Sequence, residues 1–347
     1  MIAALVVTHR GIEDITVQEL KLLGVHDAKV GDGEVYFCTE DVKTLCLIAY
    51  QLRTVMGVYW AITSWNEVFP EIVDFSFLKD KTFVVEGEHK KEVGACIVKK
   101  TGSKVCFANP DFTFVVKKDM HAYTLYLDMT GLDVGKRDYR VFLGPSDLKG
   151  TLAYALIQIA QWTPRKMILD PFCQAGTVVI EAALASRKKP VAYHVKKKLA
   201  WNNLVSVDVF SGIDKQIIPE KDFSINASDP HFKHVSASQK NAKIAQVNKC
   251  ITFTRQDIDW IDVKFEHESV DCIVTSTPPD KDMKKDDLKL LFVRGKKILK
   301  KNGTITILTK TKQQEILEAA KEYTLKEQRT VWQGQAAMTV FVFAQAQ

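Results

Sequence analysis

One glycine turn and a series of aspartates have the types and spacing of a ligand site in an α/β protein. Asp170 ends a predicted strand at 166–170, and a tight turn with Gly176 connects it to a predicted helix at 178–186. The backbone amides of such a turn, with the N-terminus of the helix, can bind an anionic or polar ligand. The alternative is a tight turn that binds nothing. Only one glycine is present, which weakens the interpretation as a dinucleotide site with a GxGxxG turn.

Two further aspartates follow the next two predicted strands. Asp229 ends the strand predicted at 224–229, and its carboxylate can hold the two hydroxyls of a ribose. Asp257 ends the strand predicted at 250–257, where it can accept a hydrogen bond from an adenine amine while Ile258 packs against the ring. Asp229 alone is equally consistent with a helix N-cap, and Asp257 alone is better explained as a loop residue. Their shared order along the chain is what favours a ligand site.

A fourth predicted strand, at 271–276, runs into the tetrapeptide Thr277, Pro278, Pro279 and Asp280. Proline cannot donate to a sheet ladder, so the strand must stop there. A loop in this place lies at the edge of the sheet where open α/β enzymes bind ligands. We therefore expect a catalytic loop, although neither its threonine nor its aspartate is an obvious catalytic group.

From about residue 151 onward, predicted helices and strands alternate along the chain, and they must position these residues. The remaining segments are predicted helices at 151–162, 234–247, 287–303 and 312–323 and strands at 304–309 and 337–343. Alternation of this kind predicts a mostly parallel sheet with helices on both faces.

The first half of the chain reads differently. It opens with a predicted strand at 3–9 and a helix at 12–23, and residues 81–127 are rich in strands. This pattern predicts one or two small α+β units. Five glycines and prolines between 129 and 150 indicate a linker.

Composition limits the partners and the compartment. The formal charge of +6 is compatible with a polyanionic partner, although each lysine pair alone is consistent with a solvated face. The seven cysteines are widely spaced without a CxxC pair, which argues against disulfides and a zinc site and favours a reducing, cytoplasmic setting. We expect no metal, no membrane span and no signal peptide.

The order strand–turn–helix, strand–Asp, strand–Asp, strand–Pro–Pro is that of an S-adenosyl-L-methionine (SAM) site in a Rossmann-like methyltransferase. The chain resembles the THUMP-containing RNA methyltransferases, in particular those that methylate the exocyclic N2 amine of guanosine in tRNA. Their first turn usually reads DPFCGSGT, and here 170–177 reads DPFCQAGT. Their KRGYR-like linker corresponds to KRDYR at 136–140. Residues 11–24, 104–116 and 188–204 resemble the family's ferredoxin-like piece, a THUMP strand pair and an insertion.

This resemblance implies an α/β fold with a C-terminal Rossmann-like methyltransferase domain, whose mostly parallel sheet has seven strands. The implied divisions are a ferredoxin-like region at 1–70, a THUMP RNA-binding domain at 71–128, a linker at 129–150 and the methyltransferase domain at 151–347. The N-terminal region would bind tRNA on its acceptor-stem side, largely by backbone and shape.

The resemblance also implies the site residues. The cofactor SAM would be held by residues of the first turn and of the next two strand ends, namely Asp170, Phe172, Cys173, Ala175, Gly176, Thr177, Asp229, Pro230, Asp257 and Ile258. The catalytic residues would be Thr277, Pro278, Pro279 and Asp280. RNA contacts would come from the linker motif and the insertion, namely Lys136, Arg137, Arg140, Lys196 and Lys197.

The tetrapeptide departs from the family pattern, which is Asp or Asn, two prolines, and Tyr or Phe. In that pattern the acidic or amide oxygen accepts hydrogens of the target amine, and the aromatic ring stacks on the flipped-out base. Here Thr277 is short and uncharged, Asp280 cannot stack, and Gln174 replaces a glycine of the first turn, where it can crowd the methionine part of SAM. A substitute stacking surface would have to come from Phe232, Trp260 or Met283.

Three hypotheses follow. The first is a SAM-dependent tRNA guanosine-N2 methyltransferase. The second is a catalytically impaired family member that binds tRNA or another RNA. The third is a methyltransferase with a protein or small-molecule substrate. The glycine pattern disfavours a nicotinamide oxidoreductase.

Overall fold

The computed structural model describes all of the 347 residues except 71, 120–121, 144–147, 206–207 and 346–347. The described residues form two compact units, each assembled from separate stretches of chain. Unit 1 contains Met1–Thr8, Thr16–Val134 and Val191–Ile213, and unit 2 contains His9–Ile15, Gly135–Pro190 and Asp214–Gln347. None of the described helices is long and apolar enough to cross a membrane.

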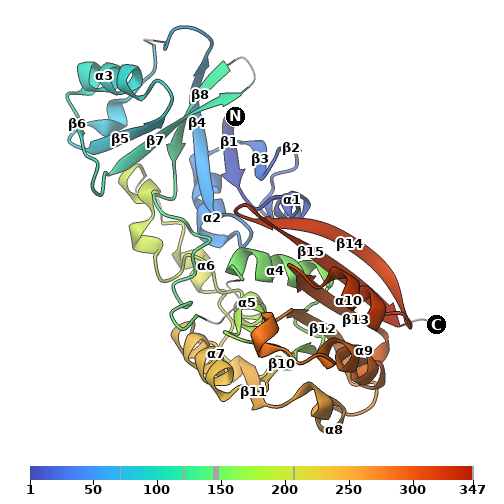
Figure 1. Cartoon of the computed structure of the whole chain (residues 1–347). Helices are drawn as coiled ribbons and strands as arrows, with labels where there is room; N and C mark the ends of the chain where they lie inside the picture. Colours follow the sequence, from blue (N-terminus) through green and yellow to red (C-terminus); the bar gives the residue numbers. More distant parts are fainter. Residues whose placement is uncertain (71, 120–121, 144–147, 206–207, 346–347) are drawn as a thin grey trace. The chain divides into compact units, whose positions relative to one another are not determined.

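A single eight-stranded sheet runs through unit 1 in the order β2-β3-β1-β4-β8-β7-β5-β6 (Figure 1). Its strands are β1 (Ile2–Val7), β2 (Ala28–Val30), β3 (Glu34–Thr39), β4 (Gly57–Trp65), β5 (Thr82–Gly87), β6 (Lys104–Val105), β7 (Phe112–Asp119) and β8 (Ala122–Asp128). Strand β4 joins the two halves because it pairs antiparallel with β1 on one side and with β8 on the other. The regions predicted at 1–70 and 71–128 therefore share one sheet and one compact unit.

The helices of unit 1 pack on this sheet through one continuous core. They are α2 (Val42–Gln51), α3 (Lys90–Thr101), and the parts of α1 (Glu13–Leu22) from Thr16 onward and of α6 (Ser211–Asp214) up to Ile213. The short 3-10 helices of this unit are η1 (Ser76–Leu78), η2 (Lys196–Lys198) and η3 (Ala200–Asn203). Helix α2 begins where the sequence indicates, because the Asp41 carboxylate accepts a hydrogen bond from the Thr44 amide at 2.8 Å.

The insertion at Val191–Ile213 belongs to unit 1, although its flanking residues belong to unit 2. Trp201 is buried, and its amide donates to the Met129 carbonyl at 3.1 Å. Phe210 packs edge-on against Tyr50, with 4.9 Å between ring centroids. The predicted boundary that placed all of 151–347 in the C-terminal domain is corrected here, because these aromatic rings find their buried partners in the N-terminal sheet unit.

Unit 2 contains a seven-stranded sheet in the order β11-β10-β9-β12-β13-β15-β14, which confirms the predicted fold class. The strands are β9 (Ile168–Asp170), β10 (Ile225–Asp229), β11 (Ile251–Arg255), β12 (Val270–Ser276), β13 (Leu299–Thr309), β14 (Tyr323–Gln333) and β15 (Ala336–Gln345). Strands β9 to β13 pair in parallel, and the β14–β15 hairpin closes one edge in antiparallel pairing.

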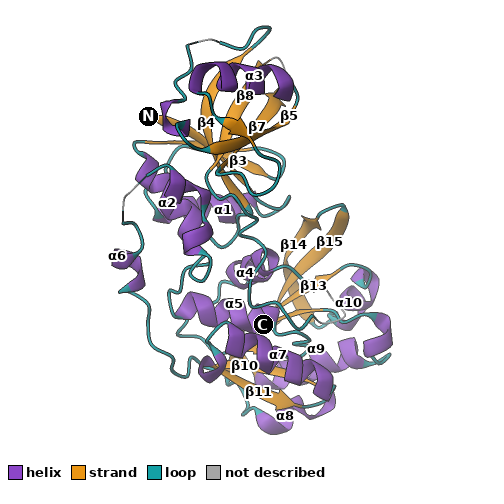
Figure 2. Ribbon diagram, turned by 90° about the vertical axis from the view of Figure 1, so that its left-hand side faces the viewer, coloured by secondary structure: helices purple, strands orange, loops and turns teal. Residues whose placement is uncertain are grey.

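Helices cover both faces of this sheet (Figure 2). One core lies under α4 (Gly150–Ile159), α5 (Thr177–Ser186) and α7 (Phe232–Ile244). The other lies under α9 (Asp287–Ile298), α10 (Gln313–Ala319) and α8 (Ile261–Lys264). The short 3-10 helices of this unit are η4 (Asn248–Cys250), η5 (Ile258–Trp260) and η6 (Asp280–Asp282).

The chain order of the strands creates a switch point in unit 2. From β9 the sheet grows through β10 to β11 on one side, and β12 then adds on the other side of β9. Parallel strands end at the same edge, so Asp170, Asp229, Asp257 and Thr277 all follow strand ends at that edge. This is the relationship that the sequence predicted.

The predicted linker at 129–150 is divided between the units at Val134 and Gly135. Tyr139 and Leu148 are buried in the core of unit 2, so the glycine-rich composition does not mark a free tether at these positions. Residues 144–147 of the predicted linker lie outside the described residues.

Candidate functional site

Asp170 lies buried at the end of β9, as the residue types predicted. Its Oδ1 accepts hydrogen bonds from the Thr275 hydroxyl at 2.7 Å and from the Phe172 amide at 3.2 Å. Burial nevertheless raises the pKa of Asp170 to about 7, because the two hydrogen bonds only partly offset the lost hydration and the charge of Asp229 adds to the rise. This carboxyl group therefore changes its charge near neutral pH.

Gly176 is required by the close approach of α7 to the first turn. Its φ is 81°, a left-handed conformation, and a Cβ added there would lie 2.9 Å from the Ser238 Cβ. The Ser238 hydroxyl donates to the Gln174 carbonyl at 2.6 Å, and Asn241 Nδ2 donates to the Ala175 carbonyl at 3.0 Å. Helix α7 thus fixes the backbone of the turn from its carbonyl side.

The amides of the turn bond within the protein, where the sequence analysis expected them to face a ligand. The Cys173 amide donates to the Ser228 carbonyl at 2.9 Å, and the Gly176 amide donates to the Cys173 carbonyl at 2.6 Å. The Gln174 amide donates to Asp229 Oδ2 at 3.1 Å. We correct the expectation for these three amides, because strand β10 and the turn itself supply their acceptors. Burial also raises the pKa of the Cys173 thiol well above its usual value, so it is no nucleophile.

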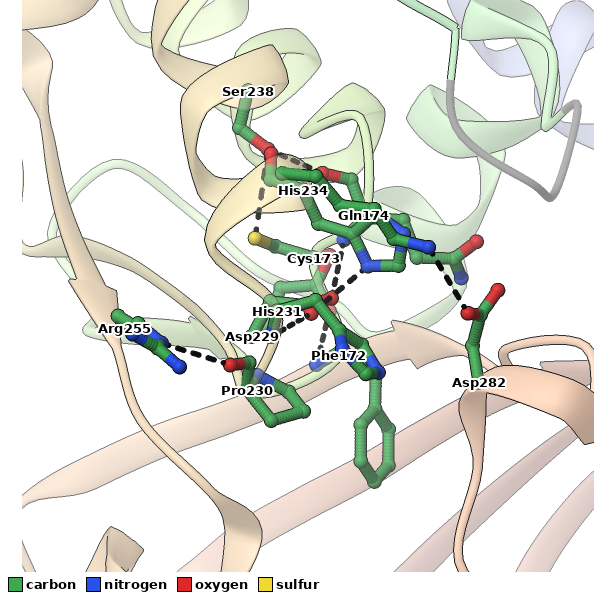
Figure 3. Close-up of polar contacts among 12 residues, drawn as sticks. Phe172, Cys173, Gln174, Asp229, Pro230, His231, His234, Ser238, Arg255 and Asp282 are labelled. Carbon is green, nitrogen blue, oxygen red and sulfur yellow. Dashed lines mark hydrogen bonds and ion pairs between the residues drawn. The ribbon is translucent and has the colours of Figure 1, made fainter.

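Both carboxylate oxygens of Asp229 already accept hydrogen bonds from the chain (Figure 3). Oδ1 accepts from the His231 amide and from His234 Nδ1, each at 2.9 Å, while Oδ2 accepts from the Gln174 amide. The Asp229 side chain is only 2% exposed. In this arrangement Oδ1 already accepts two hydrogen bonds and has no lone pair left for a ribose hydroxyl, while Oδ2 accepts only one.

Only one of the two ring nitrogens of His234 has a hydrogen-bond partner among the described residues. Its Nδ1 bonds to Asp229, but its buried Nε2 has no hydrogen-bond partner among the described residues. A buried polar atom without a partner costs about 1–3 kcal/mol. An orientation of His234 that gave Nε2 a hydrogen-bond partner would therefore be more favourable for this atom.

Gln174 closes the space between the first turn and β12. Its side chain is buried, and Nε2 reaches the Ser276 carbonyl at 3.4 Å. The cavity left beside Asp170, Gln174 and Ser276 measures about 10 Å³. This is close to the smallest volume that holds one water molecule, on the order of 10–15 Å³.

The remaining predicted SAM contacts lie around this closed centre. Phe172 and Ile258 are buried in the core beneath α9, and Thr177 begins α5. The Pro230 carbonyl accepts a hydrogen bond from Arg255 Nε at 3.1 Å. The contact of Asp257 and Ile258 with an adenine ring stays a prediction.

Asp257 follows β11 and is partly exposed, with its carboxylate in an ion pair with Lys284. It also accepts a hydrogen bond from the Asp259 amide at 3.4 Å. Burial raises the pKa of Asp257, but the hydrogen bonds and the Lys284 charge outweigh that effect and hold it below its usual value. It stays ionised and able to accept hydrogen bonds at neutral pH.

The residues predicted to hold SAM have suitable chemistry, but their arrangement leaves no room for it. Ligand sites usually enclose about 300–1,000 Å³. The space at the first turn is about 10 Å³, and the Asp229 carboxylate, which is predicted to bind the ribose, already accepts three hydrogen bonds. SAM therefore does not fit this conformation.

A larger cavity of about 430 Å³ is lined by all four residues of the tetrapeptide and shares Leu148 and Ser276 with the small one. Thr277 lines it, and its hydroxyl donates to Thr309 Oγ1 at 3.0 Å. A hydroxyl that donates in this way keeps its lone pairs for accepting a hydrogen bond. The cavity is otherwise lined by Leu148, Ser276, Pro278, Pro279, Asp280, Leu308, Lys310, Thr311, Gln333, Ala336 and Met338.

None of the described residues lining this cavity is aromatic. Asp280 stands where a stacking ring was expected, and its carboxylate forms an ion pair with Lys312 Nζ at 2.6 Å. The Asp280 side chain is 76% exposed, so its partner can be displaced at little cost. Phe232 and Trp260 are exposed, and Met283 packs against the core beneath α9.

Arg137 was predicted to contact RNA, but it lies buried inside unit 2 in an ion pair with Glu181. Its Nε donates to Glu181 Oε1 at 2.8 Å, with both side chains almost completely buried. The Tyr139 hydroxyl donates to the same oxygen at 2.8 Å. We correct this assignment, because a buried guanidinium paired in this way has no face for a phosphate.

The other predicted RNA contacts stay predictions. Lys136 and Lys197 are exposed, and Arg140 is half-buried. The Lys196 ammonium lies over the rings of Tyr193 and Phe210, at 4.7 and 5.4 Å from their centroids.

Polar side chains of α7, which were not predicted from the sequence, complete this site. His234, Ser238 and Asn241 are buried on one helix face and contact Asp229 or the first turn. Their spacing of four and three residues is the available signal, because a polar stripe at helical spacing beside a strand-end aspartate indicates a face turned toward a site.

Comparisons with known sequences identify the family of this chain. The pattern of the RMKL-like methyltransferase domain matches residues 137–339, and that of the RlmL ferredoxin-like domain matches residues 4–58. A tRNA (guanine(6)-N2)-methyltransferase of Methanocaldococcus jannaschii is 24% identical over 303 residues, which cover 78% of each chain. The ribosomal RNA large subunit methyltransferase K/L of Buchnera aphidicola is 24% identical over 78% of this chain and 44% of its own length.

Solved structures show the same fold. The SAH complex of SMU.472 superposes with a TM-score of 0.81 at 17% identity, covering 100% of this chain and 98% of the other. TrmN from Thermus thermophilus gives a TM-score of 0.77 at 22% identity and covers 100% of both chains. Because the methyltransferase-domain pattern spans more than half of the sequence, the chain belongs to the RMKL-like methyltransferase family and has the fold of SAM-dependent methyltransferases.

Proposed function

We propose that this chain is a SAM-dependent RNA methyltransferase that acts on the exocyclic N2 amine of a guanosine in tRNA, in the cytoplasm. Family membership supports methyl transfer, and a relative named as a tRNA guanine-N2 methyltransferase supports the substrate. SAM, when bound, supplies the methyl group. The observation that carries the proposal is the cavity of about 430 Å³ at the Thr277–Asp280 tetrapeptide.

The cavity supports a base as the occupant. Its volume lies in the range of small-ligand sites, about 300–1,000 Å³. Thr277 Oγ1 would accept one hydrogen of the amine, because its own proton is directed to Thr309. The Pro278 carbonyl would accept the other hydrogen, so that the nitrogen lone pair is turned away from the protein.

Unit 1 would bind the RNA. Its ferredoxin-like pattern covers residues 4–58, and we assign the THUMP role to residues 71–128 from the sequence resemblance. Helix α3 ends in Lys99 and Lys100, which can neutralise phosphates. The acceptor-stem side of tRNA would be the target, since this kind of recognition uses shape and backbone.

A second candidate is an RNA-binding family member without methyl transfer. It is favoured by the bonded carboxylate of Asp229 and by Asp280 in the place of a stacking ring. Both features would lower activity without affecting an RNA-binding surface in unit 1.

Incubation with labelled SAM and unmodified tRNA transcripts tests the proposal. Label in N2-methylguanosine after nuclease digestion supports it, and ribosomal RNA fragments in parallel test the other RNA class. Thr277→Val is the variant that should lose the label. Tight tRNA binding without label in any nucleoside would overturn the proposal in favour of the second candidate.

A further inference from the structure

We infer that the side chains of Gln174 and His234 form a latch that closes the methyl-donor site, so that the donor binds only after both side chains move. The inference rests on the proposed function in one respect, namely that the donor is SAM.

Gln174 is the larger part of the latch. Its side chain connects the turn after β9 to the carbonyl of Ser276 at the end of β12, and it reduces the space there to about 10 Å³. The contact is weak, because 3.4 Å is a long distance for a hydrogen bond. Gln174 also has a φ of 47°, a left-handed conformation that is unfavourable for a side-chain-bearing residue.

His234 is the second part. It donates to Oδ1 of Asp229, which also accepts from the His231 amide, so Oδ1 has no lone pair left for a ribose hydroxyl. Its Nε2 is buried without a partner among the described residues, and rotation toward solvent would give it one. A ribose would then replace the hydrogen bond that Asp229 loses. Opening therefore exchanges one set of hydrogen bonds for another.

The backbone around the latch does not need to change. Ser238 and Asn241 hold the carbonyls of the turn, and the amides of Gln174 and His231 hold Asp229. These bonds remain when only the two side chains rotate. The latch is thus a local device, and its removal should leave the fold intact.

Calorimetric titration of the full chain with S-adenosyl-L-homocysteine (SAH) tests the latch. The apparent Kd rises in inverse proportion to the open fraction, so Gln174→Gly should bind SAH at least about tenfold more tightly than the unchanged protein. His234→Ala should tighten binding in the same direction. Glycine suits the left-handed φ at position 174, so this variant is expected to fold.

Gln161→Gly is the matched control. Gln161 also has a left-handed φ, 51°, but it follows α4 and its exposed side chain is remote from the first turn. This substitution should leave SAH affinity unchanged. A Gln174→Gly protein that binds SAH no more tightly than the unchanged protein, including no detectable binding by either, overturns the latch.

Different experimental outcomes contradict the latch and the proposed function. Tighter SAH binding by Gln174→Gly without methyl transfer to RNA supports the latch and contradicts the proposed function. Methyl transfer by the unchanged protein, with no gain in SAH affinity in Gln174→Gly, contradicts the latch and leaves the function standing.

Discussion

The hydroxyl of Thr275 donates a hydrogen bond to the Asp170 carboxylate at 2.7 Å, from the neighbouring strand of the same sheet. Both residues are buried, and burial raises the pKa of Asp170 to about 7. Between about pH 4 and pH 7 the folded protein keeps a proton that the unfolded chain has released. The free energy of unfolding therefore falls as the pH rises through this window.

We expect Asp170→Asn to remove this pH dependence. The amide oxygen can still accept from Thr275, but no charge has to be buried. At pH 8 the variant should be more stable by about 2–4 kcal/mol, and near pH 4 the difference should vanish. Urea unfolding at the two pH values measures it. An equal gain at both pH values would mean that Asp170 is ionised throughout.

Arg137→Met should destabilise unit 2 by about 3–5 kcal/mol, because it leaves the buried Glu181 carboxylate without its cation. Lys136→Met, one residue away and exposed, should change stability by less than about 0.5 kcal/mol. Chemical denaturation of the two variants gives the comparison. If Arg137→Met instead weakened tRNA binding at unchanged stability, the expected RNA contact would be restored.

Thr277→Val should lower kcat/KM for RNA methylation by about 10²-fold or more, the usual cost of removing a positioned polar group from an active site. Valine keeps the shape of threonine but cannot accept the hydrogen of an amine. Thr324→Val on exposed β14 is the matched control and should retain full activity. Equal rates in the two variants would remove Thr277 from the mechanism.

Asp280→Tyr should raise activity by restoring a stacking surface. Stacking of a base on an aromatic ring is worth about 1–3 kcal/mol, so KM for RNA should fall by roughly 5- to 100-fold. Asp280→Asn separates the two effects, because it removes the charge paired with Lys312 without adding a ring. If both variants gain equally, charge and not stacking limits the site.

The sequence predicted the part of the site that depends on strand order. Asp170, Asp229 and Thr277 each end or follow a predicted strand, and parallel strands end at a common edge. The hydrogen-bond partners of each side chain could not be predicted from strand order. The partners of Asp229 come from the helix that follows it and from the turn after β9, and only the folded chain brings them together.

The elements that the sequence analysis missed lacked a local signal. Only Val331 of strand β14 is buried, and the polar run at 326–330 interrupts the alternation of apolar and polar side chains. The sequence alone predicts that Arg137 is an exposed charge, because its buried partner, Glu181, is 44 residues away in the sequence. The aromatic residues of the insertion at Val191–Ile213 do not indicate which unit they will pack against.

The exchange of segments between the two units limits how such a protein can change in evolution. Ile12 and Ile15 lie in the core of unit 2 although they precede almost all of unit 1 in the chain, and Trp201 lies in the core of unit 1 although it follows the linker. A recombination event at Val134 would leave both products with an incomplete core. We therefore expect that a single cut in the gene cannot transfer either half, with a complete core, to another protein.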